Sequence, residues 1–305
     1  MNSTVLVQGR RARRSATQQT RLVLGVFKLR IGVMIMVTAL VGLAVTPGPA
    51  LGPAQMIVLA LSVLGASASA GAFNQYFEAD SDRLMARTRG RAFVTGALPH
   101  TRWWLLPIAA LLVVSVGAAW RALNAHAALY VFLGAFVYAV VYTVWLKRRS
   151  WTNIVVGGLA GSFAVLAGAA AVDPTLGPLP LLLALVLFLW TPPRFWSLAI
   201  AYHAEYSAAG VPMLPVVVGP ERAARIVFAS TAVLVGASLL PGLFGAGPIY
   251  TAGALVGGVY FLRKAHALSR APSRKAAMAS FFASLLQLSL LLGAASIDGL
   301  IRSSS

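Results

Sequence analysis

The strongest constraint on this chain is a series of apolar segments, each long enough to cross a bilayer, that runs from residue 31 to residue 301 with short interruptions. A transmembrane helix needs about 20 consecutive apolar residues. The predicted spans are residues 31–47, 54–77, 103–120, 125–146, 152–172, 176–200, 224–241, 248–262 and 277–301. We therefore expect an all-α membrane protein in which about nine helices form a bundle around a central cavity.

The composition agrees with this expectation. Hydrophobic residues make up 59% of the 305-residue chain and charged residues only 10%, whereas soluble proteins carry about 25% charged residues. Small residues, gathered in runs such as 65–72, let helix backbones approach closely in lipid. The absence of cysteine excludes thiolate metal sites and cysteine nucleophiles. The predicted organisation is a basic cytoplasmic tail, residues 1–30, followed by a single membrane domain, residues 31–301.

The net charge of +18 has two possible explanations, nucleic-acid binding and membrane topology. If the amino terminus is cytoplasmic, all but two of the 25 Lys and Arg residues fall on the cytoplasmic side, and the exceptions are Arg121 and Arg302. Because this is the positive-inside pattern, we interpret the charge as topology and expect a lipid bilayer, not a nucleic acid, as partner. The expected location is a bacterial plasma (inner) membrane, or a mitochondrial inner membrane in a eukaryote.

Carboxylates are rare, and five of the seven acidic residues lie on the predicted cytoplasmic side: Glu78, Asp80, Asp82, Glu205 and Glu221. If the helix that begins near residue 54 continues past its apolar part, Asn74, Glu78 and Asp82 share one face. Three oxygen donors on one face suit Mg²⁺, which combines a few carboxylates with substrate phosphates. Asp80 would point away, and Arg87, one turn further on, is placed to meet a phosphate. The alternative is a solvated helix end with local Asp–Arg pairs.

A second polar segment, residues 191–206, lies on the same predicted side of the membrane. It contains Arg194 and, about three helical turns later, Glu205. Two acidic helix ends on one side, surrounded by basic loops, indicate a site in which a metal ion bridges carboxylates to a diphosphate while Lys or Arg neutralises the remaining charge.

Four stretches carry a family resemblance: NQYFEADSDRLMART (74–88), YTVWLKRRSWTNIVVGG (142–158), TPPRFWSLAI (191–200) and EYSAAGVPMLPVV (205–217). Together they resemble the UbiA-type intramembrane prenyltransferases, and most of all the protoheme farnesyltransferases (haem O synthases), over about residues 28–300. The chain departs from the pattern in three places. Arg194 stands where the family usually has histidine, residues 162–166 lack a proline pair, and glutamates occupy positions 78 and 205 in place of aspartates.

The resemblance implies Mg²⁺-dependent transfer of a farnesyl group from farnesyl diphosphate to the vinyl group of haem B, a substrate and not a resident cofactor. It implies metal ligation by Asn74, Glu78, Asp82 and Glu205. The implied diphosphate contacts are Arg87, Lys147 and Arg148, assisted by Arg30 and Tyr142. Near the acceptor it implies Arg194, Phe195 and Trp196. Simpler roles remain open, because Arg30 and Arg148 also fit topology charges and Trp196 also fits an interface anchor.

Three alternatives stay open at this point. The first is the same chemistry on another acceptor, such as a quinone precursor or a chlorophyll-type ring, which the Arg194 departure favours. A transporter with a basic vestibule would place ionisable residues at mid-membrane, whereas these acids lie near helix ends. A non-catalytic assembly factor would tolerate loss of the carboxylates. For the leading hypothesis, a haem A synthase or an oxidase-assembly protein is a candidate partner.

Overall fold

The computed structural model describes residues 15–304, with side chains as far as residue 301, and every regular element in that range is helical. The predicted all-α class is confirmed. Most of the predicted basic tail, residues 1–14, lies outside the described residues, as does the side chain of Arg302. The division into a tail and a single membrane domain stays a prediction.

Long helices correspond to every predicted span. They are α2 (Leu29–Val45), α3 (Pro53–Phe77), α5 (Leu105–Ala122), α6 (Ala125–Phe136) with the π-helix η2 (Val137–Leu146), α8 (Leu159–Val172), α9 (Pro178–Ala201), α12 (Pro220–Leu239), α13 (Pro248–Arg270) and α14 (Arg274–Ser304). The shorter helices are α1 (Ala16–Val26), η1 (Arg102–Trp104), α4 (Ala79–Asp82), α7 (Asn153–Gly157), α10 (His203–Ala208), α11 (Leu214–Val218) and η3 (Leu240–Phe244).

Seven helical segments in the described part of the chain are long and apolar enough to cross a membrane. An eighth is obtained if α1 and α2, which meet at a bend of 49°, count as one span. The helix α13 is not among them, and its carboxyl end carries Arg263 and Lys264. The protein is therefore a multi-pass membrane protein, while the count of nine spans and the cytoplasmic amino terminus stay predictions.

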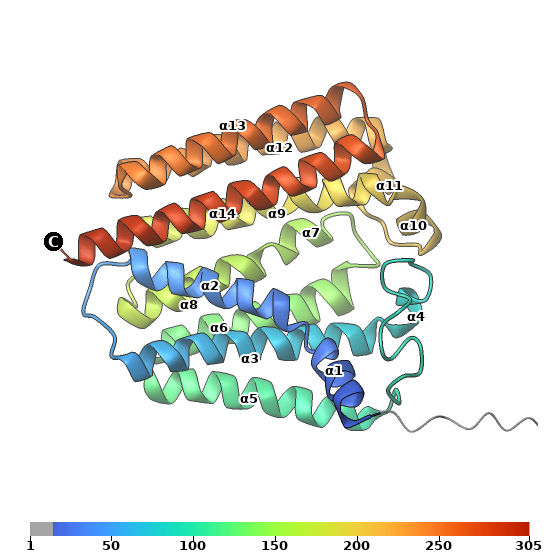
Figure 1. Cartoon of the computed structure of the whole chain (residues 1–305), viewed down its shortest axis with the longest axis horizontal. Helices are drawn as coiled ribbons and strands as arrows, with labels where there is room; N and C mark the ends of the chain where they lie inside the picture. The colour runs from blue at the N-terminus through green and yellow to red at the C-terminus, as the bar shows by residue number, and fades with distance from the viewer. Residues whose placement is uncertain (1–14, 305) are drawn as a thin grey trace, which may run out of the picture.

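Successive long helices run in opposite directions, and together they form two adjoining groups (Figure 1). One group packs α3, α5 and α6 around α2 and α8, and the other packs α9, α12, α13 and α14 together. The groups meet where α9 contacts α8 and α14 contacts α2. Consequently the carboxyl ends of α3, η2 and α9 lie at the same end of the bundle, where α1, α4, α10 and α11 also gather.

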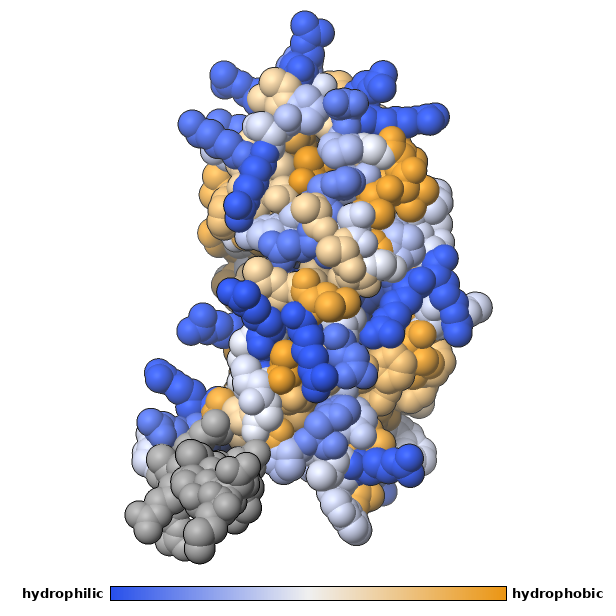
Figure 2. Space-filling model, turned by 90° about the vertical axis from the view of Figure 1, so that its right-hand side faces the viewer, coloured by the Kyte–Doolittle hydropathy of each residue, from blue (hydrophilic) through white to orange (hydrophobic). Residues whose placement is uncertain are grey.

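That end of the molecule carries many hydrophilic side chains, with hydrophobic patches between them, as the space-filling view shows (Figure 2). Exposed arginines of the loop after α4 and of the turn after η2 belong to it: Arg83, Arg87, Arg89, Arg148 and Arg149. The predicted sorting of basic loops to one side thus corresponds to one end of the folded bundle, which we call the basic end.

The contact between α2 and α8 depends on two glycines. A Cβ atom at Gly42 would overlap the carbonyl oxygen of Val165, and one at Gly168 would overlap the carbonyl oxygen of Ala39. The two backbones therefore touch with no side chain between them, as small residues permit in membrane helices. This contact fixes the spacing of the central helices.

We expect Gly168→Ala to destabilise the detergent-solubilised protein by about 1–3 kcal/mol, because the added methyl group forces the two backbones apart. The matched control is Gly161→Ala in the same helix, where a Cβ meets nothing within 4 Å. Thermal unfolding followed by size-exclusion chromatography should show a lower midpoint for Gly168→Ala only. Equal midpoints for the two variants would contradict this account of the contact.

Candidate functional site

Three oxygen-bearing side chains form a buried row at the end of α3. The helix α3 ends at Phe77, but backbone hydrogen bonds continue across the junction with α4: Glu78 N donates to Asn74 O at 3.0 Å and Asp82 N donates to Glu78 O at 2.9 Å. Asn74, Glu78 and Asp82, the acidic row, are 3%, 2% and 3% exposed. Asp80 points outward, as predicted, and forms an exposed 3.8 Å pair with Arg83.

Each member of the acidic row contacts a basic side chain from a different segment. Lys147 Nζ lies 2.5 Å from Glu78 Oε1, and Arg91 forms an ion pair with Asp82. Lys28 Nζ donates to Asn74 Oδ1 at 2.6 Å. A buried carboxylate without such a partner is strongly destabilising, so these contacts keep the row compatible with the interior of the bundle.

The π-helix η2 presents its side chains to the acidic row. Lys147 N donates to Tyr142 O, five residues earlier, at 2.9 Å. Thr143 Oγ1 accepts from Asn74 Nδ2 at 3.0 Å and donates to Tyr138 O at 2.8 Å. The amide of Asn74 is thereby oriented so that its oxygen faces Lys28. A π-helix is rare and often marks a functional site, and no pattern in the amino-acid sequence predicts this one.

Lys28 reaches the site because the helix is interrupted between α1 and α2. Its backbone is left-handed, with φ 50°, and the stem of its side chain packs against Gly71. Its Nζ also donates to Tyr138 Oη at 3.2 Å. Arg30, the ligand that the family resemblance implies for this region, is exposed. Arg91 was also missed, since its position nine residues after Asp82 in a loop has no recognisable spacing.

The second polar segment joins the same end of the molecule. Glu205 Oε2, on α10, accepts a hydrogen bond from Ala86 N at 3.1 Å and so ties α10 to the loop after α4. Arg148 donates to Ser81 Oγ on α4 at 2.8 Å, whereas Arg87 is exposed. In residues 15–304, no three side chains of His, Cys, Asp or Glu form a group that could hold a metal ion. Metal ligation by Glu205 together with the acidic row stays a prediction.

Arg194 lies among aromatic rings on α9 and α14. Its guanidinium carbon is 4.4 Å from the ring centre of Trp190, 5.0 Å from that of Phe195 and 5.4 Å from that of Phe281. Its Nε is buried and has no hydrogen-bond partner. Trp196, considered above as an interface anchor, is instead 5% exposed.

The donor chemistry of the acidic row fits a hard divalent cation. Carboxylate and amide oxygens are the ligands that Mg²⁺ accepts, and Mg²⁺ usually shares its shell with substrate phosphates. The neighbouring cations Lys28, Lys147 and Arg91 carry the donors that phosphate oxygens require. The arrangement can therefore hold a divalent metal together with a diphosphate.

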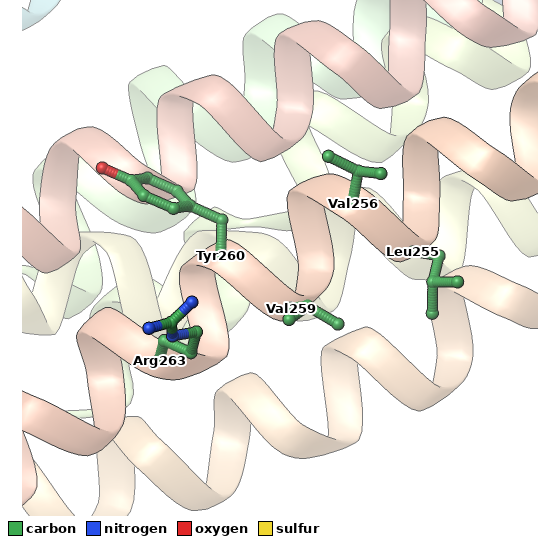
Figure 3. Close-up of a pocket in the computed structure, with 5 residues that line it drawn as sticks. All are labelled: Leu255, Val256, Val259, Tyr260 and Arg263. Carbon is green, nitrogen blue, oxygen red and sulfur yellow. The ribbon is translucent and has the colours of Figure 1, made fainter.

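A surface pocket of about 350 Å³ is not part of this arrangement. Its lining side chains, shown in Figure 3, all come from α13: Leu255, Val256, Val259, Tyr260 and Arg263. The helix α13 packs against α12 and α14, whereas the acidic row lies on α3 and α4. The mostly apolar lining, with no carboxylate, is suited to lipid contact.

Known proteins share the family and the fold of this chain. The model of the UbiA prenyltransferase family matches residues 35–290, so the chain belongs to that family of membrane prenyltransferases. Protoheme IX farnesyltransferase 2 of Paramagnetospirillum magneticum is 55% identical over 285 residues, covering 93% of this chain and 99% of the relative. Protoheme IX farnesyltransferase 1 of the same organism is 49% identical, covering 87% of this chain and 93% of the relative.

Solved structures share the fold at much lower identity. A structure of digeranylgeranylglyceryl phosphate synthase superposes with a TM-score of 0.77 at 16% identity, covering 93% of this chain and 99% of that chain. A UbiA homologue from Archaeoglobus fulgidus bound to DMAPP and Mg²⁺ gives 0.70 at 17% identity, covering 87% and 98%. The helical arrangement is thus that of the UbiA fold.

We expect Lys28→Met to weaken the binding of inorganic diphosphate in the presence of Mg²⁺ by about tenfold or more, because a charge-assisted hydrogen bond donor is removed. Arg30→Met, two residues away but exposed, should change the affinity much less. Isothermal titration of both variants in the same detergent measures the difference. A larger loss for Arg30→Met would restore the assignment made from the sequence.

Proposed function

We propose that this protein transfers the farnesyl group of farnesyl diphosphate to a vinyl group of haem B and so forms haem O, in the plasma (inner) membrane of a bacterium. The observation that carries the proposal is the buried acidic row with its three basic partners, which has the composition of a metal–diphosphate site. The relatives named protoheme IX farnesyltransferase, one of them 55% identical over nearly the whole chain, support haem B as the acceptor. Delivery of the product to a haem A synthase or an oxidase-assembly partner stays a prediction.

Asn74, Glu78 and Asp82, with Glu205 across the loop, are the residues that would hold Mg²⁺. When bound, this ion would neutralise part of the charge of the diphosphate. Lys147 and Lys28 already lie at the row, so their ammonium groups are placed to bind the diphosphate oxygens. We assign Arg148 and Arg87 to the terminal phosphate of the diphosphate, because both side chains are exposed at the basic end.

These cations act on the step that breaks the carbon–oxygen bond of the allylic diphosphate. Negative charge develops on the departing diphosphate, and donors that are already oriented stabilise that charge without reorganising. Lys147 is oriented by its ion pair with Glu78, and Lys28 by Asn74 and Tyr138. The bond therefore ionises to inorganic diphosphate and an allylic carbocation.

The carbocation requires surroundings that exclude water until the acceptor has reacted. Tyr138 and Tyr142, whose rings stack with centres 5.8 Å apart, border the row on η2, and Phe195 supplies a further ring on α9. The vinyl group of haem attacks the allylic carbon and forms the new carbon–carbon bond. Water then adds to the resulting cation on the vinyl carbon and releases a proton, which gives the hydroxyethylfarnesyl product.

We expect Glu78→Ala and Asp82→Ala to lower the turnover number by about a hundredfold or more, the size of effect seen when a transition-state contact is lost. Asp80→Ala is the matched control, because that carboxylate is exposed and outside the row. The assay combines the protein in nanodiscs with haem B, farnesyl diphosphate and Mg²⁺, and mass spectrometry follows haem that gains farnesyl plus water. Chelation of Mg²⁺ should abolish the product, and re-addition should restore it.

Two results would contradict the proposal at different levels. If folded protein consumes farnesyl diphosphate only with a quinone precursor or a chlorophyll-type ring, the proposed metal–diphosphate site stands but haem B is the wrong acceptor. Folded protein that consumes no prenyl diphosphate with any of these acceptors would overturn the proposed reaction. Monodisperse elution in size-exclusion chromatography establishes that each variant is folded.

A further inference from the structure

Arg194 is a half-buried cation whose contacts in the described part of the chain are aromatic. The rings of Trp190, Phe195 and Phe281 lie around its guanidinium, and its Nε has no hydrogen-bond partner. This differs from Lys147, whose charge faces a carboxylate, and from Lys28, which donates to two oxygen atoms. The buried Nε–H of Arg194 is therefore left without an acceptor.

A guanidinium in such surroundings is costly unless it binds an anion. Aromatic faces attract a cation, but they cannot accept its in-plane N–H bonds. Ionisable residues inside membrane proteins usually pair with another group and mark a binding site. The five donors of arginine form a rigid planar fork that matches a carboxylate in a bidentate arrangement. The chemistry of Arg194 is thus that of a carboxylate receptor.

The aromatic surroundings hold this receptor in a fixed position. Trp190 Nε1 donates to Ser284 O on α14 at 2.8 Å. One turn beyond Arg194, the hydroxyl groups of Ser197 and Ser280 lie 2.9 Å apart and join α9 to α14 again. Because these contacts hold the Trp190 ring and join the two helices on either side of Arg194, little conformational entropy is lost when an anion binds to the arginine.

Arg194 also lies a few side chains from the proposed diphosphate site. Phe195, one of its ring partners, packs against the apolar cluster that contains Met85 and Ile154, and Tyr142 packs against the same cluster. The ring centre of Tyr142 is 5.8 Å from Lys147 Nζ. An acceptor held at Arg194 would therefore extend towards the place where the allylic cation forms.

We propose that Arg194 binds a propionate carboxylate of haem B and thereby selects an acceptor that carries a carboxylate and orients it for the reaction. This inference rests on the proposed function and deepens it. Haem B carries its two propionates on one edge of the ring and its vinyl groups away from that edge. Anchoring a propionate at Arg194 presents a vinyl group to the prenyl chain. The diphosphate is not the anion that we assign to Arg194, because Lys28 and Lys147 are already placed to bind it.

The test compares haem B with its dimethyl ester, in which both propionates are neutral, as acceptors for the same enzyme. For native protein we expect kcat/KM to be about tenfold or more higher for the free acid, as for a lost charge-assisted hydrogen bond. In Arg194→Gln the ratio of the two values should fall to near one, while KM for farnesyl diphosphate stays unchanged. Taking the ratio within each variant cancels the different partitioning of the two haems into detergent.

Two further variants sharpen the comparison. Arg194→Lys keeps the charge but not the planar fork, so its preference for the free acid should fall between those of the native protein and Arg194→Gln. Arg263→Gln removes an exposed arginine on α13 and should keep the native ratio. Titration of haem absorbance with each variant measures acceptor binding without turnover and should follow the same order.

Three outcomes would overturn the inference and leave the proposed function standing. Native protein that converts the free acid and the diester equally well would show that no carboxylate is recognised. An equal loss for both acceptors in Arg194→Gln would assign the arginine a structural role. A raised KM for farnesyl diphosphate with an unchanged acceptor ratio would assign it to the diphosphate. Native protein that converts neither haem contradicts the proposed function itself, and the inference falls with it.

Discussion

A carboxylate can remain inside a membrane protein only when a cation or several hydrogen-bond donors face it, and this requirement organises the basic end of the bundle. Glu78 and Asp82 are almost fully buried, and each is paired, with Lys147 and Arg91 respectively. These pairs join η2 and the loop after α4 to the end of α3. The contacts that make burial of the acids possible therefore also bring together the groups that a diphosphate would bind.

Each cation reaches the row through an irregularity in the backbone. Lys28 itself has a left-handed backbone at the break between α1 and α2, and its side chain reaches Asn74. Lys147 follows a π-helix, and Arg91 belongs to a loop stabilised by short turns. Regular α-helices supply the scaffold, but the positions of the charged groups depend on the places where regular helix stops. Such departures from regular geometry commonly mark functional sites in proteins.

The acidic row could be predicted because its evidence is local. Asn74, Glu78 and Asp82 follow one another at four-residue intervals, and the helical hydrogen bonds that place them together depend on the same short stretch. Lys28 and Arg91 could not be predicted as partners, since their contacts with Asn74 and Asp82 exist only in the folded bundle. The left-handed turn at Lys28 also explains why Arg30, two residues later, points away.

The helices likewise could be predicted in part: their positions follow from the local sequence, but their ends do not. The apolar pattern located every long helix, but α12 begins at Pro220, four residues before the predicted span, and α13 continues to Arg270, eight residues beyond its predicted end. Hydropathy reports the thickness of the bilayer, whereas a helix ends where its backbone hydrogen bonds end, which can be in water. The family resemblance added the roles of the residues, which neither the hydropathy nor the four-residue spacing of the acidic row supplies.

Because the proposed site is built from helix ends at one end of the bundle, none of the residues assigned to it lies in the opposite half of the helices. The turns that join α2 to α3, α5 to α6 and α8 to α9 lie there, far from the acidic row (Figure 1). Lipids of different chain length can be accommodated by tilting or by local bilayer deformation at modest cost. Such adjustments act on the part of the helices that is remote from the proposed site, so they leave the acidic row and its basic partners in place.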